Sequence, residues 1–79
     1  MNRFRKYFIA LMGEVSRLAY SMQEKSIGEL STIDVSIELS HAEQRALNAI
    51  ALIYQCQFCY AEHLSSWCVQ VVADNNYID

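Results

Sequence analysis

The sequence predicts a small all-α domain, because it contains two long amphipathic stretches with a helix-start signal between them. The chain has 79 residues, which suits a single domain over residues 1–79. Apolar residues make up 53% of it, yet a chain this short buries only about 60% of the surface that its unfolded form exposes. We therefore expect a helical hairpin core and a homo-oligomer, because self-association covers apolar surface that one copy leaves exposed.

The first expected helix covers Asn2 to about Glu24. Its apolar residues recur at alternating spacings of four and three, which traces a single stripe along a helix. The stripe consists of Phe4, Phe8, Leu11, Val15, Leu18 and Met22. Tyr7, Met12 and Ala19 widen it beyond the narrow seam of a two-stranded coiled coil. This width suits packing in a globular core or at a subunit interface, and of the two we expect burial at a subunit contact.

The next segment changes its pattern after Gly28. Apolar residues at 33, 35, 37 and 39 alternate with polar residues at 34, 36, 38 and 40, which is typical of a short strand. A lone strand leaves its backbone groups unpaired unless a copy from another subunit pairs with it. Three interpretations therefore stay open for residues 33–39: a strand, an extended connector or a helical turn.

A second helix is expected to begin at His41. Ser40 and Glu43 have the spacing of a capping box, in which each side chain bonds to the backbone N–H of the other residue. A broad apolar face follows, formed by Ala46, Leu47, Ile50, Ala51, Ile53 and Tyr54. Helix-compatible sequence continues to about Ala73, which is unusually long for a small domain. We therefore expect the helix to be interrupted near residues 54–55.

Charge and hydropathy exclude two classes of partner. The net charge of −3 gives no broad basic surface for phosphate groups, so we expect no nucleic acid partner. No apolar run approaches the 18 or so residues that span a bilayer, and the N-terminus lacks signal-peptide features, so we expect no membrane partner and a cytoplasmic location. In that reducing compartment the three cysteines are expected to be thiols, metal ligands or catalytic groups.

The chemistry of the sequence is concentrated in Cys56-x-x-Cys59-x-x-x-His63. On a helix, spacings of three and four place both sulfurs and the imidazole on one face. An imidazolium lowers the pKa of a nearby thiol, and two adjacent cysteines can close a disulfide after one of them is oxidised. We expect a redox site without metal or cofactor, in which the Cα atoms of Cys56 and Cys59 lie less than about 7 Å apart and Cys68 stays outside.

Residues 39–73, which include this motif, resemble the alkyl hydroperoxidase D-like domains of the carboxymuconolactone decarboxylase family. The resemblance implies that Cys59 attacks the substrate, Cys56 resolves the oxidised Cys59, and His63 activates Cys59. It also implies an upstream glutamate about a dozen residues before the first cysteine. Gln44 occupies that position, and we take the adjacent Glu43 as the candidate acid. The implied function is a thiol-dependent oxidoreductase that reduces a peroxide or a disulfide through a Cys56/Cys59 cycle. Its expected partner is a small peroxide or a protein dithiol or disulfide, and the sequence leaves the physiological reductant open.

Two other classes of protein remain open. Free cysteines are often plain core residues, in which case the chain is a non-catalytic interaction protein, such as a small inhibitor or adaptor, that uses the stripe from Phe4 to Met22. Alternatively, adding Cys68 gives C-x2-C-x3-H-x4-C, which is close to a zinc-knuckle spacing and suggests a zinc-stabilised binding module. In the redox interpretation, Cys68 is a core or interface residue beside Trp67 and Val69.

Overall fold

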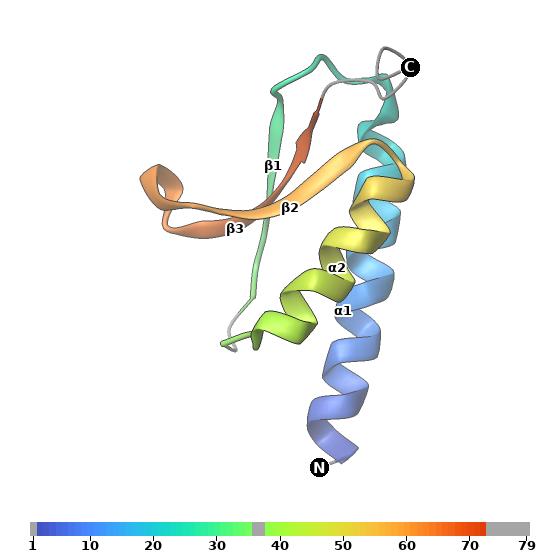
Figure 1. Cartoon of the computed structure of the whole chain (residues 1–79), viewed down its shortest axis with the longest axis vertical. Coiled ribbons are helices and arrows are strands. Elements are labelled where there is room, and N and C mark those ends of the chain that lie inside the picture. Colours follow the sequence, from blue (N-terminus) through green and yellow to red (C-terminus); the bar gives the residue numbers. More distant parts are fainter. Residues whose placement is uncertain (1, 36–37, 73–79) are drawn as a thin grey trace.

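The computed structural model describes residues 2–35 and 38–72 and has an α+β fold, so the predicted all-α fold is wrong. The described residues form two α-helices, two short 3-10 helices and a three-stranded antiparallel sheet. In chain order the elements are α1 (Asn2–Ser21), η1 (Met22–Glu24), β1 (Leu30–Ile33), α2 (His41–Ile53), β2 (Cys56–Ala61), η2 (Glu62–Leu64) and β3 (Ser66–Val71). Figure 1 shows the two helices side by side and the β2–β3 hairpin reaching away from them.

Strand β3 is the centre of the sheet, with β1 on one side and β2 on the other. Both pairings are antiparallel, and their registers place Thr32, Cys68 and Cys59 in one row across the three strands. The next row contains Ile33, Trp67 and Tyr60. Because side chains directly opposite each other in a sheet point to the same face, these two rows lie on opposite faces.

The helices cover only one face of the sheet. That face supplies Ile33, Cys56, Phe58, Val69 and Val71 to the hydrophobic core. The rings of Phe58 and Trp67 stack there with centroids 4.8 Å apart. Cys68 and Ala61 are also buried, but they lie on the other face and are not part of this core.

The N-terminal helix is confirmed, but its apolar stripe packs inside the chain from Phe8 to Met22. Leu11, Val15 and Met22 are buried in the core between α1, α2 and the sheet, so the expected burial at a subunit contact is wrong for these residues. The reason is that the sheet provides an apolar face that a purely helical chain lacks. Between Leu11 and Met22 these buried stripe residues are therefore not exposed as a contact surface. Neither described helix is long and apolar enough to cross a membrane.

The start of α2 agrees with the sequence prediction. The Glu43 N–H donates to the Ser40 hydroxyl at 3.2 Å, and the Ser40 N–H donates to the Glu43 carboxylate at 2.9 Å. This completes the predicted capping box before His41. The predicted interruption near residues 54–55 is also confirmed, because α2 ends at Ile53 and Gln55 has a φ of 62°.

The predicted continuation as helix after this interruption is wrong, because residues 56–61 and 66–71 are strands. The helix-facing positions of the hairpin carry aromatic and β-branched residues at every second position, which favours strands. These residues are Phe58, Tyr60, Trp67, Val69 and Val71. Residues 33–39 were expected to form a strand, an extended connector or a helical turn. Of the described residues in this range, Ile33 alone belongs to a strand, β1, which pairs with β3 of the same chain. Residues 36–37 lie outside the described part.

Candidate functional site

The predicted Cys-x-x-Cys-x-x-x-His site is not on a helix. Cys56 and Cys59 both lie on β2, where residues three positions apart point to opposite faces of the sheet. At about 3.3 Å per residue their Cα atoms are about 10 Å apart, which exceeds the span of a disulfide. The expected approach of Cys56 to Cys59 is therefore wrong.

Cys56 is a core residue. Its side chain has no exposed surface, and its sulfur lies 3.8 Å from the carbonyl oxygen of Ala19 on α1 and 3.6 Å from that of Tyr54. Burial raises the pKa of the Cys56 thiol. Because its sulfur lies in the core, on the sheet face opposite to Cys59 and Cys68, Cys56 fits a packing role best.

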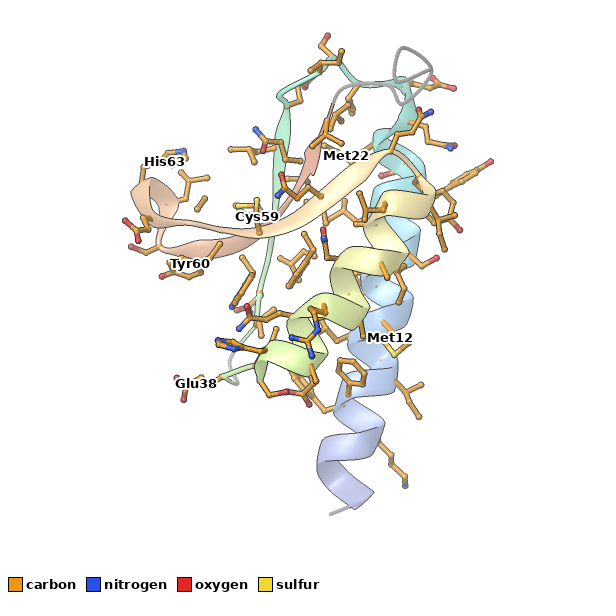
Figure 2. The ribbon with its side chains drawn as sticks, viewed as in Figure 1. Met12, Met22, Glu38, Cys59, Tyr60 and His63 are labelled. Carbon is orange, nitrogen blue, oxygen red and sulfur yellow. The ribbon has the colours of Figure 1, made fainter. Side chains whose placement is uncertain are left out.

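Cys59 and Cys68 are direct partners across β2 and β3. They share the sheet face that the helices leave uncovered, so the expectation that Cys68 lies apart is wrong. Cys59 is partly exposed, whereas Cys68 has no exposed surface. Figure 2 shows Cys59 on the side of the hairpin opposite Tyr60, which lies on the helix-facing side. The structure therefore brings together a thiol that solvent reaches and a buried thiol beside it.

The backbone pattern defines the kind of pair that these cysteines form. The Phe58 N–H points away from β3 and donates to the side-chain oxygen of Asn48 at 2.9 Å. The Val72 N–H donates to the Gln55 carbonyl at 3.2 Å, so odd-numbered residues of β2 direct their backbone groups toward β3. Cys59 and Cys68 are consequently a hydrogen-bonded pair, for which Cα atoms lie about 5.5 Å apart.

This spacing allows a disulfide but does not favour a relaxed one. The Cα separation falls inside the usual range of about 4.4–6.8 Å. The Cβ atoms of directly opposite residues are about 4.5–5.5 Å apart, whereas a disulfide needs about 3.8 Å. Closing the bond therefore draws the two strands together locally, and strain of this kind makes a disulfide easier to reduce.

The electrostatic surroundings keep both thiols protonated at neutral pH. Burial raises the pKa of Cys59, and the neighbouring Cys68 sulfur raises it further because two negative charges would repel. Burial also raises the pKa of Cys68, against a smaller lowering by a hydrogen bond from the backbone of Ala61. The lowered Cys59 pKa that the motif suggested is therefore wrong.

The two remaining candidate residues lie away from the paired sulfurs. His63 is exposed in η2, the turn that joins β2 to β3, and Figure 2 shows it at the tip of the hairpin with Cys59 farther back. Glu43 is at the start of α2, where its carboxylate is engaged with the Ser40 N–H. Helix α2 packs against the face of the sheet opposite to Cys59. Glu43 therefore acts as a helix cap in this structure.

A metal centre finds no support in the described residues. Within residues 2–35 and 38–72, no three histidine, cysteine, aspartate or glutamate side chains gather closely enough to hold an ion. The zinc arrangement suggested by Cys56, Cys59, His63 and Cys68 fails because Cys56 faces the core and Cys59 and Cys68 face the other way.

Sequence reasoning missed Cys68 as the partner of Cys59. The missed signal is the pair of alternating segments, residues 56–61 and 66–71, separated by the four residues Glu-His-Leu-Ser. Read as a hairpin with that loop, the segments pair position 59 with position 68.

No protein-family model, curated protein or solved structure matches this chain. The resemblance to the alkyl hydroperoxidase D-like family therefore has only the motif behind it, and the helical fold that it implies is not the fold of this chain. Nothing in these comparisons supports an oxidoreductase or a peroxidase. The role of the thiol pair has to be inferred from its geometry.

Proposed function

We propose that this chain is a thiol–disulfide redox protein whose cycling pair is Cys59 and Cys68. The observation that carries the proposal is their direct pairing across β2 and β3 on the uncovered face of the sheet. The proposal keeps the thiol chemistry expected from the sequence and keeps Cys59 as the attacking residue. It replaces Cys56 by Cys68 as the resolving residue.

The exposures of the two thiols assign their order of reaction. Cys59 is the sulfur that solvent reaches, so its thiolate attacks a substrate disulfide, forms a mixed disulfide and releases one substrate thiolate. The Cys68 thiolate then attacks the Cys59 sulfur and releases the second substrate thiolate. Each substrate thiolate takes up one proton, which Cys59 or Cys68 has lost. The substrate disulfide is thereby reduced by two electrons, and the two cysteines are oxidised to one disulfide.

A peroxide leads to the same product. The Cys59 thiolate takes one oxygen atom from the peroxide to form a sulfenic acid, and the peroxide leaves as an alcohol or water. Cys68 then displaces the hydroxyl group as water and closes the disulfide. This route is slower at neutral pH than in a dedicated peroxidase, because the raised pKa of both thiols keeps the thiolate fraction low.

The pairing type supports a reversible role over a structural one. A disulfide between hydrogen-bonded partners is strained, and strained disulfides are the labile and regulatory ones. An external dithiol then returns the pair to two thiols. The pair accordingly responds to the balance between thiols and disulfides around it.

The proposal is tested by equilibrating the protein with glutathione buffers of increasing disulfide content. After quenching by alkylation, mass spectrometry counts the free thiols. We expect one internal disulfide per chain, reached equally from the reduced and the oxidised protein. Cys68→Ser should form only a mixed disulfide with glutathione at Cys59, whereas the matched control Cys56→Ala should behave like the wild type. Failure to form an internal disulfide in any buffer, or a disulfide that the reducing buffers never open, would contradict the proposal.

A further inference from the structure

On the outer edge of β1, backbone N–H and C=O groups form no hydrogen bond with any residue that the structure describes. The Val71 N–H donates to the Glu29 carbonyl at 3.0 Å, so alternate residues of β1 direct their backbone groups toward β3. By this alternation Ser31 and Ile33 face β3, and Leu30 and Thr32 direct their N–H and C=O groups outward. At the opposite edge of the sheet, the Phe58 N–H of β2 is already bonded to Asn48. The outward groups of Leu30 and Thr32 therefore give the β1 edge capacity to pair with another strand.

A groove of about 370 Å³ lies between this edge and α1. Leu11 and Leu18 from α1 and Ile33 from β1 give it an apolar floor. Glu14, Arg17 and Asp34 are charged groups on its lining. A row of open backbone groups beside an apolar groove matches the way in which domains bind peptides by strand addition.

We propose that the groove binds an extended peptide, which adds to the sheet beside β1. The peptide backbone bonds to the N–H and C=O groups of Leu30 and Thr32. Its alternate side chains enter the groove, where an apolar residue contacts Leu11 and Leu18. Binding of this kind takes its affinity from the backbone and its selectivity from the groove.

The dimensions of the groove set the length of the peptide. Its lining runs from Tyr7 to Leu18 on α1, a distance of about 16 Å at 1.5 Å per residue. An extended peptide rises about 3.3 Å per residue, so about five residues cover this length. Strand β1 has four residues, of which Thr32 and Ile33 line the groove.

The charges of the groove select a basic peptide. Glu14 is paired with Arg17, its neighbour one helical turn away. Asp34 is exposed and forms no ion pair with any residue that the structure describes. A lysine or arginine at the end of the peptide beside Asp34 supplies the missing opposite charge.

A second copy of this chain fits the groove less well than a peptide does. In a second copy, the β1 side chains that would face the groove are Ser31 and Ile33. Ile33 is already buried in the core of its own chain, so it is not available to fill the groove. The second copy would also bring its own α1 to the same side of the sheet.

The test uses a blocked peptide of about seven residues that alternates valine and threonine and ends in lysine. Nuclear magnetic resonance titration of the full chain should show saturable shifts at the amides of Leu30 and Thr32. Both amides should exchange rapidly with solvent before binding and slowly after it. A peptide that is N-methylated on the residues facing β1 loses its hydrogen-bond donors, and we expect its affinity to fall at least about tenfold.

Matched variants of the chain separate backbone pairing from charge. Thr32→Pro removes the outward N–H without breaking a bond to β3 and should abolish binding, whereas Thr32→Val keeps the N–H and should bind like the wild type. Asp34→Asn should lower the affinity for the lysine peptide by about two- to fivefold. It should not lower the affinity for an otherwise identical peptide that ends in glutamate.

Three results would overturn the proposal. The first is no binding, and the second is equal binding of the N-methylated peptide. The third is protection of the Leu30 and Thr32 amides in the free chain together with a dimer in sedimentation, which would assign the edge to self-association. If Thr32→Pro does not fold, the N-methylated peptide still decides the question on the wild-type chain.

Discussion

Asn48 on α2 accepts a hydrogen bond from the backbone N–H of Phe58 on β2 at 2.9 Å. This bond joins the second helix to an edge strand across ten positions of the chain. It satisfies an N–H that β3 does not reach and occupies part of the β2 edge. Successive residues of β2 direct their backbone groups alternately outward and toward β3, so the outward Phe58 N–H is followed by Cys59, whose backbone groups face Cys68.

We predict that Asn48→Ala destabilises the domain by about 1–3 kcal/mol, because it leaves the partly buried Phe58 N–H without an acceptor. Asn48→Asp keeps an acceptor oxygen and should retain most of the stability. Chemical denaturation measures the difference, and hydrogen exchange of the Phe58 amide reports it locally. Equal stability of Asn48→Ala and the wild type would show that this hydrogen bond does not stabilise the edge strand β2.

The capping box separates the structural and catalytic interpretations of Glu43. Ser40→Ala should cost about 0.5–2 kcal/mol, because the Glu43 N–H loses its acceptor. Glu43→Gln retains an oxygen for the Ser40 N–H, so it should leave the helix intact and should not alter thiol oxidation. A Glu43→Gln chain that folds normally but oxidises much more slowly would restore Glu43 to the relay role suggested by the family resemblance.

We predict that alkylation reaches Cys59 first, because Cys59 is partly exposed and the other two thiols are fully buried. The rate at Cys59 should still be increasing at pH 9, since burial and Cys68 raise the pKa of Cys59 above its ordinary value. Cys68→Ser removes one of these causes and should shift the pH profile toward lower pH. Iodoacetamide labelling at several pH values, followed by peptide mapping, measures both effects. A marked slowing in His63→Ala would instead indicate activation by the imidazole.

Alkaline pH should destabilise the folded chain. The pKa of Cys56, Cys59 and Cys68 is raised by folding, so the unfolded state loses these protons first as the pH increases. The stabilisation is complete below the unfolded value of about 8.5 and is lost as the pH rises through the folded values. The free energy of unfolding should therefore fall less for Cys56→Ala than for the wild type between neutral and alkaline pH. Denaturation curves of both proteins at both pH values measure this difference. A Cys56→Ala chain whose stability falls as steeply as that of the wild type would contradict this contribution.

Local signals in the sequence predicted the two helices well. The apolar stripe identified α1, and the spacing of Ser40 and Glu43 identified the start of α2 at His41. The end of α2 near residues 54–55 was also predicted, although no glycine marks it. Gln55 instead adopts the left-handed conformation itself, which costs a side chain more than it costs glycine.

The arrangement of the candidate site residues was mispredicted because a spacing has no geometric meaning until the secondary structure is known. Three residues from Cys56 to Cys59 lead to the same face of a helix but to opposite faces of a strand. Changing helix to strand therefore separated the predicted pair. It also introduced Cys68, whose place opposite Cys59 follows only once residues 56–61 and 66–71 are recognised as the two strands of a hairpin.

The location of β1 shows the same limitation. The alternation over residues 33–39 suggested a strand, but pairing with β3 occurs at Leu30–Ile33, directly before most of that pattern. Strand position is decided by the available partner, and here β3 presents its free edge to residues 30–33.

Locating the disulfide tests the account most directly. Cleavage after Glu62 leaves Cys56 and Cys59 on one peptide and Cys68 on the other, so the digest distinguishes the two pairings. The protein is oxidised with excess glutathione disulfide, its remaining thiols are blocked, and the digest is analysed by mass spectrometry with and without reduction. We predict that the two peptides are joined until reduction and that the blocked thiol is Cys56. Separate peptides with an internal Cys56–Cys59 disulfide would contradict the account.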